Sequence, residues 1–358
     1  MKLIFTILPI IYLAGNGYLF WRSMQVLTQI PLWGKWIFGI LFWFTAFSLF
    51  ISFGISNCRV PDIFPRILFH IGSVWLVFLL YMVLALVFFD ILHIIIPKLT
   101  GRFWYAIALT TAILVIGNIN YRNPKTEELK LTFSNSSPNN DPLRIVAISD
   151  VHLGYGTGPK MLRKYINKIN SLRPDIVLIA GDMIDNSVKP LWEAPFADEL
   201  SRITVPIYLA PGNHEYISSI EECSKYLAQT NVTMLRDSAV TIDNGFTIIG
   251  RDDWSNSSRA SLEELLSRYP SQKGTIVLDH QPREIHIGDS LGVNLMICGH
   301  THNGQVWPLN IIVKNMYAQS HGYRKWKNSH VWVSSGISLW GPPFRIGTRS
   351  DIALIEIK

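Results

Sequence analysis

Two histidines separated by one residue stand in a turn near the end of the chain. His300 and His302 lie within residues 299–305, directly after the apolar run Leu295–Cys298. Neutral imidazole is the commonest nitrogen ligand of transition metals in proteins. On its own the His-x-His pattern is weak evidence, because most histidine pairs in loops are simply solvated. The pair therefore predicts a metal site only if other ligand-type residues converge on it.

Four further groups of ligand-type residues also follow apolar runs. These groups are Asp150-Val151-His152, Gly181-Asp182, Gly212-Asn213-His214-Glu215 and Asp279-His280. In an open α/β sheet ligands bind beyond the carboxyl ends of the strands, so residues at five strand ends can meet at one place. Each group alone is also explained as a turn or a helix cap. Burying so many polar groups without an ion would be costly, so the five together indicate a metal site.

The elements that would position these groups alternate between strand and helix. We predict strands at residues 145–148, 176–179, 207–209, 246–249, 275–278, 295–298, 331–333 and 352–357. We predict helices at residues 159–172, 191–203 and 217–229, and a fourth that begins with the capping-box pattern Ser261-Leu262-Glu263-Glu264. This alternation predicts an α/β domain over residues 142–358.

The first third of the chain is apolar. Four uncharged runs cover residues 3–21, 36–55, 67–89 and 103–121. Each has the length of about 20 residues that spans a hydrocarbon core. The first run also has the length of a signal peptide, but it lacks a small-residue cleavage pattern and further spans follow it. We therefore predict a four-helix transmembrane domain over residues 1–121.

Residues 122–141 are polar and turn-rich, which predicts a linker; the alternation of Leu129, Leu131 and Phe133 suits a short edge strand within it. Four spans would place both ends of the membrane domain on one side, where six Lys and Arg flank the spans, against four on the other side. Positive charge prefers the cytoplasm. We therefore expect a multi-pass protein of the cell membrane with its C-terminal domain in the cytoplasm.

The charge distribution and the cysteine content limit the kinds of partner that we expect for this protein. Residues 1–141 carry 10 Lys and Arg against 5 Asp and Glu, and the remainder carries 22 against 21. The cationic excess therefore belongs to the membrane half, and the bilayer is a better partner for it than nucleic acid. The three cysteines form neither a disulfide framework nor a C-x-x-C motif. The sequence does not determine the oligomeric state.

The ordered motifs Asp-x-His, Gly-Asp, Gly-Asn-His-Glu, His and Gly-His-x-His resemble the calcineurin-like metallophosphoesterase superfamily over about residues 143–305. Gly304-Gln305 and the sequence at residues 340–345 are similar to a bacterial membrane-associated branch, which includes phosphodiesterases and a hydrolase of UDP-diacylglucosamine. The resemblance implies two mixed β-sheets packed face to face with flanking helices. Asn303 stands where this branch often has glycine, a departure that leaves the ligand positions unchanged.

The resemblance also implies a site with two metals, Asp182 bridging them. One metal would take Asp150, His152, Asp182 and His302, and the other Asp182, Asn213, His280 and His300. His214 would act beside the substrate as an acid or a stabiliser of the transition state. Arg345 is a candidate phosphate contact, although an ordinary surface arginine is an equal alternative, and Asp185 would orient a ligand or cap a turn. Mixed nitrogen and oxygen ligands suit Mn, Fe or Zn better than Mg or Ca.

We therefore predict a membrane-anchored two-metal phosphoesterase in which metal-activated water attacks a phosphodiester, a phosphomonoester or a pyrophosphate. The membrane anchor suggests a lipid-linked substrate. The alternative is a catalytically silent membrane receptor or scaffold that binds a nucleotide or phosphate ligand, and the complete ligand set favours the enzyme. A nuclease is a third hypothesis, which the nearly neutral second half of the chain disfavours.

Overall fold

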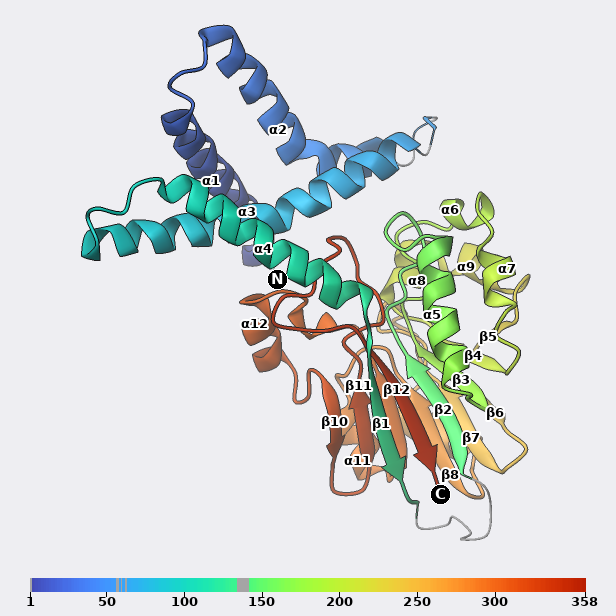
Figure 1. Ribbon diagram of the computed structural model, residues 1–358. Coiled ribbons are helices and arrows are strands. Elements are labelled where there is room, and N and C mark those ends of the chain that lie inside the picture. The colour runs from blue at the N-terminus through green and yellow to red at the C-terminus, as the bar shows by residue number, and fades with distance from the viewer. Residues whose placement is uncertain (1, 56–57, 59, 62, 134–141) are drawn as a thin grey trace. The chain divides into compact units, whose positions relative to one another are not determined.

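The computed structural model describes residues 2–55, 58, 60–61, 63–133 and 142–358, and the side chains among these from residue 8 onward. The chain forms two compact units (Figure 1). The first contains Met1–Ile119 and Gly341–Phe344, and the second contains Asn120–Trp340 and Arg345–Lys358. The end of the predicted linker, residues 134–141, lies outside the described residues.

Four helices make up the first unit. They are α1 (Lys2–Val26), α2 (Leu32–Ile55), α3 (Ile63–Ile95) and α4 (Arg102–Arg122). Phe42, Met82 and Ala106 are buried in a shared apolar cluster, so α2, α3 and α4 pack through it. Three charged groups meet where the Asp90 carboxylate pairs with the guanidinium groups of Arg22 and Arg102.

Three of the described helices, α2, α3 and α4, are long and apolar enough to cross a membrane. The predicted number was four. The first predicted span falls in α1, whose described side chains begin at Leu8 and include the buried polar residues Asn16, Arg22 and Ser23. α1 is 25 residues long but is not among the described helices that have both the length and the apolar composition of a span, so the structure supports three spans among the described residues.

The second unit is built on two six-stranded mixed sheets. The first sheet has the order β1 (Lys125–Leu131), β12 (Asp351–Ile357), β2 (Leu143–Ile148), β3 (Ile176–Ala180), β4 (Ile207–Ala210) and β5 (Val232–Met234). The second has the order β10 (Gly322–Lys325), β11 (His330–Val333), β9 (Leu295–Cys298), β8 (Gly274–Leu278), β7 (Phe246–Gly250) and β6 (Ser238–Thr241). In the first sheet β2, β3, β4 and β5 are parallel, while β12 is antiparallel to β2.

The two sheets pack face to face, as the resemblance implied, and this confirms the predicted fold class. The core between them contains Ile145 and Leu178 from the first sheet and Ile276 and Trp332 from the second. A second core packs helices against the outside of the first sheet: α5 (Pro159–Ser171), α7 (Phe196–Leu200) and α9 (Ile220–Leu227). A third packs α10 (Leu262–Arg268) and α11 (Ile285–Ser290) on the outside of the second sheet. Strands buried on both faces explain the continuous apolar runs.

Several element boundaries differ from the prediction. The helix predicted at 191–203 is two short helices, α6 (Lys189–Trp192) and α7, separated by a segment that contains Pro195. The helix predicted at 217–229 is broken at Ser219, whose φ of 75° ends α8 (Asn213–Ile217) before α9 begins. The capping prediction at Ser261 is confirmed, because its side chain accepts a hydrogen bond from the Glu264 N–H.

Candidate metal centre

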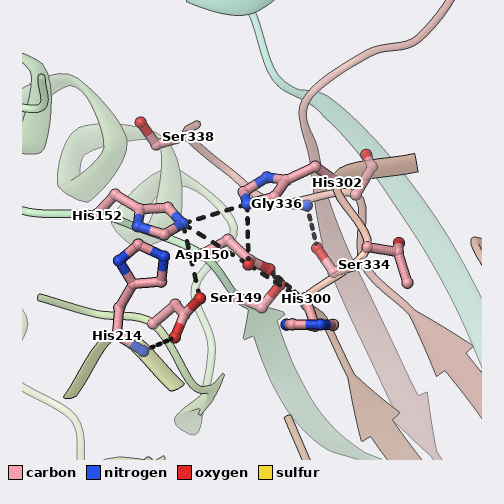
Figure 2. A network of polar contacts seen from close by, with 12 residues as sticks. Ser149, Asp150, His152, His214, His300, His302, Ser334, Gly336 and Ser338 are labelled. Carbon is pink, nitrogen blue, oxygen red and sulfur yellow. Dashed lines mark hydrogen bonds and ion pairs between the residues drawn. The ribbon is translucent and has the colours of Figure 1, made fainter. Parts of the chain in front are cut away.

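The predicted ligands all lie shortly after the carboxyl ends of strands. Asp150, Asp182 and Asn213 follow β2, β3 and β4 of the first sheet, and His280 and His300 follow β8 and β9 of the second. His302 begins the short 3-10 helix η1 (His302–Gly304). Because the parallel strands of both sheets end at the same edge of the sandwich, residues far apart in the sequence meet there (Figure 2).

The backbone at these positions is held in an unusual conformation. Asp150, His152, Asp182, His300 and His302 have φ values of 54°, 48°, 53°, 70° and 47°. Left-handed backbone at residues other than glycine costs of the order of 1–3 kcal/mol each, and it concentrates at functional sites. The turns therefore aim these side chains at the site at a conformational cost.

The first group of side chains comprises Asp150, His152 and His302. The Nε2 atoms of His152 and His302 lie 3.2 Å apart, and Figure 2 shows both rings beside Asp150. Asp150 Oδ1 lies 3.4 Å from His302 Nε2 and 3.8 Å from His152 Nε2. One carboxylate oxygen and two ring nitrogens thus converge within the span of a single metal ion.

The second group comprises Asp182, Asn213, His280 and His300. Asp182 Oδ2 lies 3.1 Å from His280 Nε2, and Asn213 Oδ1 lies 3.2 Å from His280 Nε2 and 2.8 Å from His300 Nδ1. Asp182 Oδ2 also lies 3.8 Å from His152 Nε2 in the first group. The Asp182 carboxylate therefore stands between the two groups, which is where a bridging ligand would have to lie.

Hydrogen bonds to the backbone orient two of these side chains, His280 and Asp182, and leave one potential metal-binding atom of each facing the site. His280 Nδ1 donates to the Ala180 carbonyl over 2.7 Å, so Nε2 is its free nitrogen. Asp182 Oδ1 accepts from the His214 backbone N–H over 2.8 Å. Gly212 makes the close approach possible, because a Cβ there would lie 2.3 Å from Asp182 Oδ1.

Glu215 has a role that the motif alone did not predict. It is fully buried and accepts hydrogen bonds from the backbone N–H groups of Asp182 (3.0 Å), Ile184 (2.9 Å) and Gly212 (2.7 Å). Burial, with the nearby Asp182 carboxylate, raises the pKa of Glu215 to about 7. Glu215 thus joins the turns after β3 and β4. The sequence signal was a glutamate three residues after the N-cap residue Gly212.

His214 and Asp185 lie on one side of the first group. His214 Nδ1 is 3.2 Å from Asp185 Oδ1, and Asp185 Oδ1 is also 3.5 Å from His152 Nδ1. The ring centroids of His214 and His152 are 4.6 Å apart, and Figure 2 shows the two rings adjacent. His214 is also 6.3 Å from the half-exposed ring of Trp340, so it lies at the edge of the buried cluster.

Arg345 lies beneath the His302 turn. Its side chain is fully buried and donates to the backbone carbonyls of His302 (2.5 Å), Ser335, Gly336 (3.1 Å) and Ser338 (3.0 Å). Burial lowers the pKa of the Arg345 guanidinium to about 10. This geometry favours a positioning role for Arg345 over the phosphate contact predicted from the sequence.

The buried carboxylates of the cluster require compensating positive charge. Burial would raise the pKa of Asp150, Asp182 and Asp185, but the surrounding histidines hold all three below their usual range. Burial lowers the pKa of His300 to about 4 and of His302 to about 3, which leaves two neutral imidazoles. Burial opposes protonation of His152 as well, but Asp150 and Asp185 raise its pKa to about 10.

The donors fit a metal ion. His302 Nδ1, a buried polar atom beside this space, has no hydrogen-bond partner among the described residues, and the Nε2 atoms of His152 and His302 face each other 3.2 Å apart beside Asp150. Buried carboxylates need compensating charge, and the lone pair of a neutral imidazole needs a hydrogen-bond donor or a metal ion. Nitrogen and oxygen donors of this kind suit divalent transition metals.

Residues 143–304 match the family model of the calcineurin-like phosphoesterases. This part of the chain is therefore a calcineurin-like phosphoesterase domain. The match covers every predicted ligand and ends before Arg345.

Curated relatives extend the similarity beyond that domain. A metallophosphoesterase of Campylobacter jejuni is 28% identical over 376 aligned positions, which cover 98% of this chain and 97% of the relative. A metallophosphoesterase of Helicobacter pylori is 30% identical over 221 residues, which cover 60% of each chain. A transmembrane protein with metallophosphoesterase domain from Bos taurus is 30% identical over 283 residues, which cover 73% of this chain and 63% of the relative. The matched part thus spans less than two thirds of the last two relatives.

Proposed function

We propose that this protein is a membrane-anchored phosphoesterase that uses two divalent transition-metal ions to hydrolyse a phosphodiester, a phosphomonoester or a pyrophosphate. One observation carries the proposal: two carboxylates, an amide and four imidazoles from both sheets converge on one buried space. A fold alone does not define an activity, but a complete donor set at strand ends supports one.

In this proposal Asp150, His152 and His302 hold one ion, while Asn213, His280 and His300 hold the other. The Asp182 carboxylate, within 3.8 Å of ring nitrogens in both groups, bridges them. Bound there, the pair of ions would activate water at neutral pH and offset the charge that develops on the phosphate oxygens. Mn, Fe and Zn are the candidates that the donor set supports.

His214 is the group proposed to act on the substrate. Asp185, 3.2 Å from its Nδ1, would hold that nitrogen as a proton donor and so orient the ring. The other ring nitrogen, Nε2, would then be the one to donate a proton to the leaving oxygen or a hydrogen bond to the transition state. Glu215 keeps the turn that carries His214 in place, because it anchors the Gly212 N–H.

The membrane part supports a substrate near the bilayer. Three helices have the length and composition of membrane spans, and we propose that residues 1–121 anchor a catalytic domain formed by residues 142–358. The anchor would hold the site close to lipid, which favours a lipid-linked phosphate ester or pyrophosphate. The cytoplasmic orientation of the catalytic domain was inferred from six cations against four, a count that required four spans. With three spans Lys2 changes sides and the count becomes five against five, so charge no longer favours either side.

The test uses the full-length protein in detergent, loaded in turn with Mn, Fe or Zn, with bis-p-nitrophenyl phosphate as substrate. We expect metal-dependent turnover in the wild type. Asp182→Asn, which keeps the side-chain size and removes the charge, should lose most of its bound metal. His214→Ala should retain metal but lose turnover by about 100-fold or more.

The matched control is His286→Ala, because His286 is an exposed histidine of α11 outside the cluster. It should leave both metal content and turnover unchanged. Wild-type protein that binds two metals but hydrolyses neither this diester nor p-nitrophenyl phosphate would favour the receptor or scaffold. Full turnover in both site variants would refute the assignment of the site.

A further inference from the structure

Helix α12 (Leu309–Met316) is apolar, and most of its side chains are exposed. None of its residues is buried, and Trp307, Leu309, Ile311, Ile312 and Met316 have between 44% and 66% of their surface exposed. Leu309, Ile312, Val313 and Met316 follow helical i, i+3, i+4, i+7 spacing, so they form one stripe. Exposed apolar side chains gathered on one element indicate an interaction surface, here called the α12 face.

The α12 face is joined directly to the candidate metal centre. Gly304 of η1 packs so closely on α12 that a Cβ there would lie 2.5 Å from the Asn310 backbone. Tyr317, the residue after the helix, has its ring centroid 6.5 Å from that of His300. Whatever contacts the α12 face therefore lies next to the ligand turn.

The segment that connects α4 to β1 lies at the end of the second unit that also carries the predicted ligands. Only Asn123 and Pro124 separate the end of α4 at Arg122 from the start of β1 at Lys125. Since β1 runs parallel to β12, and β12 antiparallel to β2, β1 starts at the edge where β2 ends and the ligands lie (Figure 1). A two-residue link cannot carry this end far from the helix that it follows.

Cations accompany the apolar side chains. Lys314 is exposed on α12 itself. Lys125 and Arg349 are exposed at the same end and, with His321 and Asn303, line a polar pocket of about 410 Å³. Apolar and aromatic side chains flanked by Lys and Arg are the pattern of an element that lies in the interface of an anionic membrane.

We propose that the α12 face docks on the surface of a lipid bilayer, with Ile312 and Met316 among the acyl chains and Lys314 at the headgroups. The bilayer is the occupant that the structure supports, because the site-bearing end is tied within two residues to a helix long and apolar enough to span a membrane. The docked face brings the ligand turn to the headgroup level. The further step, in which the docked face brings phosphate esters of the bilayer to the site, rests on the proposed function.

The test places a probe on the α12 face of the full-length chain. Cys58 is an exposed free thiol, whereas Cys223 and Cys298 are buried, so Ile312→Cys is made in a Cys58→Ser background and labelled with bimane. The control position is Ser171→Cys, at the exposed end of α5, where the chain turns toward the start of β3. Both proteins enter phosphatidylethanolamine–phosphatidylglycerol vesicles that contain doxyl-labelled phosphatidylcholine.

We expect the probe at position 312 to lose about half of its fluorescence or more to the doxyl lipids, and the probe at position 171 to lose little. Equal, weak quenching at both positions would overturn the proposal. So would self-quenching at position 312 that grows with the number of chains per vesicle, because a second copy would then cover the face.

A second variant separates this proposal from the proposed function. Ile312→Ser with Met316→Ser alters only exposed side chains, so detergent-solubilised protein should hydrolyse bis-p-nitrophenyl phosphate as the wild type does. A probe at Ile311→Cys in that background should lose most of its lipid quenching; retained quenching would overturn docking through this stripe. Absence of turnover in the wild type would count against the proposed function alone, since the quenching experiment does not depend on catalysis.

Discussion

The Glu215 carboxylate accepts a hydrogen bond from the backbone N–H of Asp182 over 3.0 Å. The same carboxylate accepts from Ile184 and Gly212, so one side chain joins the turn after β3 to the turn after β4. Two of the proposed ligands, Asp182 and Asn213, lie in or directly after these turns. Their spacing therefore depends on a residue that is not proposed to touch a metal.

We predict that Glu215→Ala destabilises the catalytic unit by about 3 kcal/mol or more, because three buried N–H groups lose their acceptor. Glu215→Gln, with one acceptor oxygen, should have a smaller effect in the same direction. Urea unfolding followed by tryptophan fluorescence measures both. Glu263→Gln, an exposed glutamate of α10, is the control. An unchanged midpoint for Glu215→Ala would show that these hydrogen bonds do not hold the turns.

Asp185 should be required for turnover although it is not proposed as a ligand. It faces Nδ1 of both His214 and His152, at 3.2 and 3.5 Å. Asp185→Asn preserves shape and removes the charge that orients the two rings, so turnover should fall about 10–100-fold. Steady-state kinetics with metal analysis measures this change. The prediction fails if the variant keeps full turnover.

Metal binding should release protons. In the metal-free protein His152, with its pKa raised to about 10, carries a proton at neutral pH; so does His280, whose neighbouring Asp182 raises its pKa despite burial. His300 and His302 do not. Uptake of metal at about pH 7 should therefore release about two protons per chain, and apparent affinity should rise with pH. Calorimetry in buffers of different ionisation enthalpy measures the protons, and a value near zero would contradict the assignment.

Removing the metals should also loosen the domain. The buried carboxylates Asp150 and Asp182 come from the first sheet, whereas His280 and His300 come from the second. Chelation with EDTA removes the charge that balances them, so the melting temperature should fall, and Mn should restore it. Scanning calorimetry checks this, with Asp182→Asn as the control that should respond weakly. An EDTA-insensitive wild type would argue against a metal shared by both sheets.

Arg345 should affect kcat or metal content and leave KM nearly unchanged. Its guanidinium donates to the carbonyl of His302 and to three others, so it supports the ligand turn from below. Arg345→Lys retains the charge but loses the multiple donors, and turnover should fall about 10-fold or more. Arg324→Ala, an exposed arginine of β10, is the control. A rise in KM alone would instead restore the phosphate contact predicted from the sequence.

Asp252 should stabilise the folded protein at pH values above the ordinary pKa of an aspartate. Burial would raise its pKa, but hydrogen bonds from Tyr216 (2.6 Å), Asn256 (2.8 Å) and Arg236 (3.1 Å) lower it. Because the folded pKa is the lower one, this stability is complete above about pH 4 and is lost as the pH falls below that value. In EDTA, Asp252→Asn should therefore unfold with a shallower pH dependence than the wild type. Parallel slopes would contradict the prediction.

The sequence was informative where chemistry follows directly on a buried strand. Asp150, Asp182, Asn213, His280 and His300 each come two or three residues after an apolar run, and the parallel edge of a sheet brings such positions together. Face-to-face packing followed from the resemblance, because the strands alone do not state how two sheets are stacked. The role of Glu215 was not accessible, since it depends on three N–H groups from two turns.

Local patterns failed where burial decides the outcome. Arg345 in a Gly- and Pro-rich turn has the same local sequence whether it lies on the surface or, as here, is fully buried. The short α12 has an apolar period that equally suits a core helix, and only the fold exposes it. The first apolar run predicted a span, but it contains Asn16 and is followed by Arg22, and both side chains are buried against other helices. The periodicity and composition of a segment do not show which other elements it packs against.

Strand β12, which comes last in the sequence of the first sheet, lies between β1 and β2, the two strands that come first. β12, residues Asp351–Ile357, pairs with β1 on one side and β2 on the other. The ribosome must therefore reach residue 357 before the first sheet can close. Until then β1 and β2 present open edges, so nascent chains of this protein should depend on chaperones, and shortening within β12 should abolish assembly of the site.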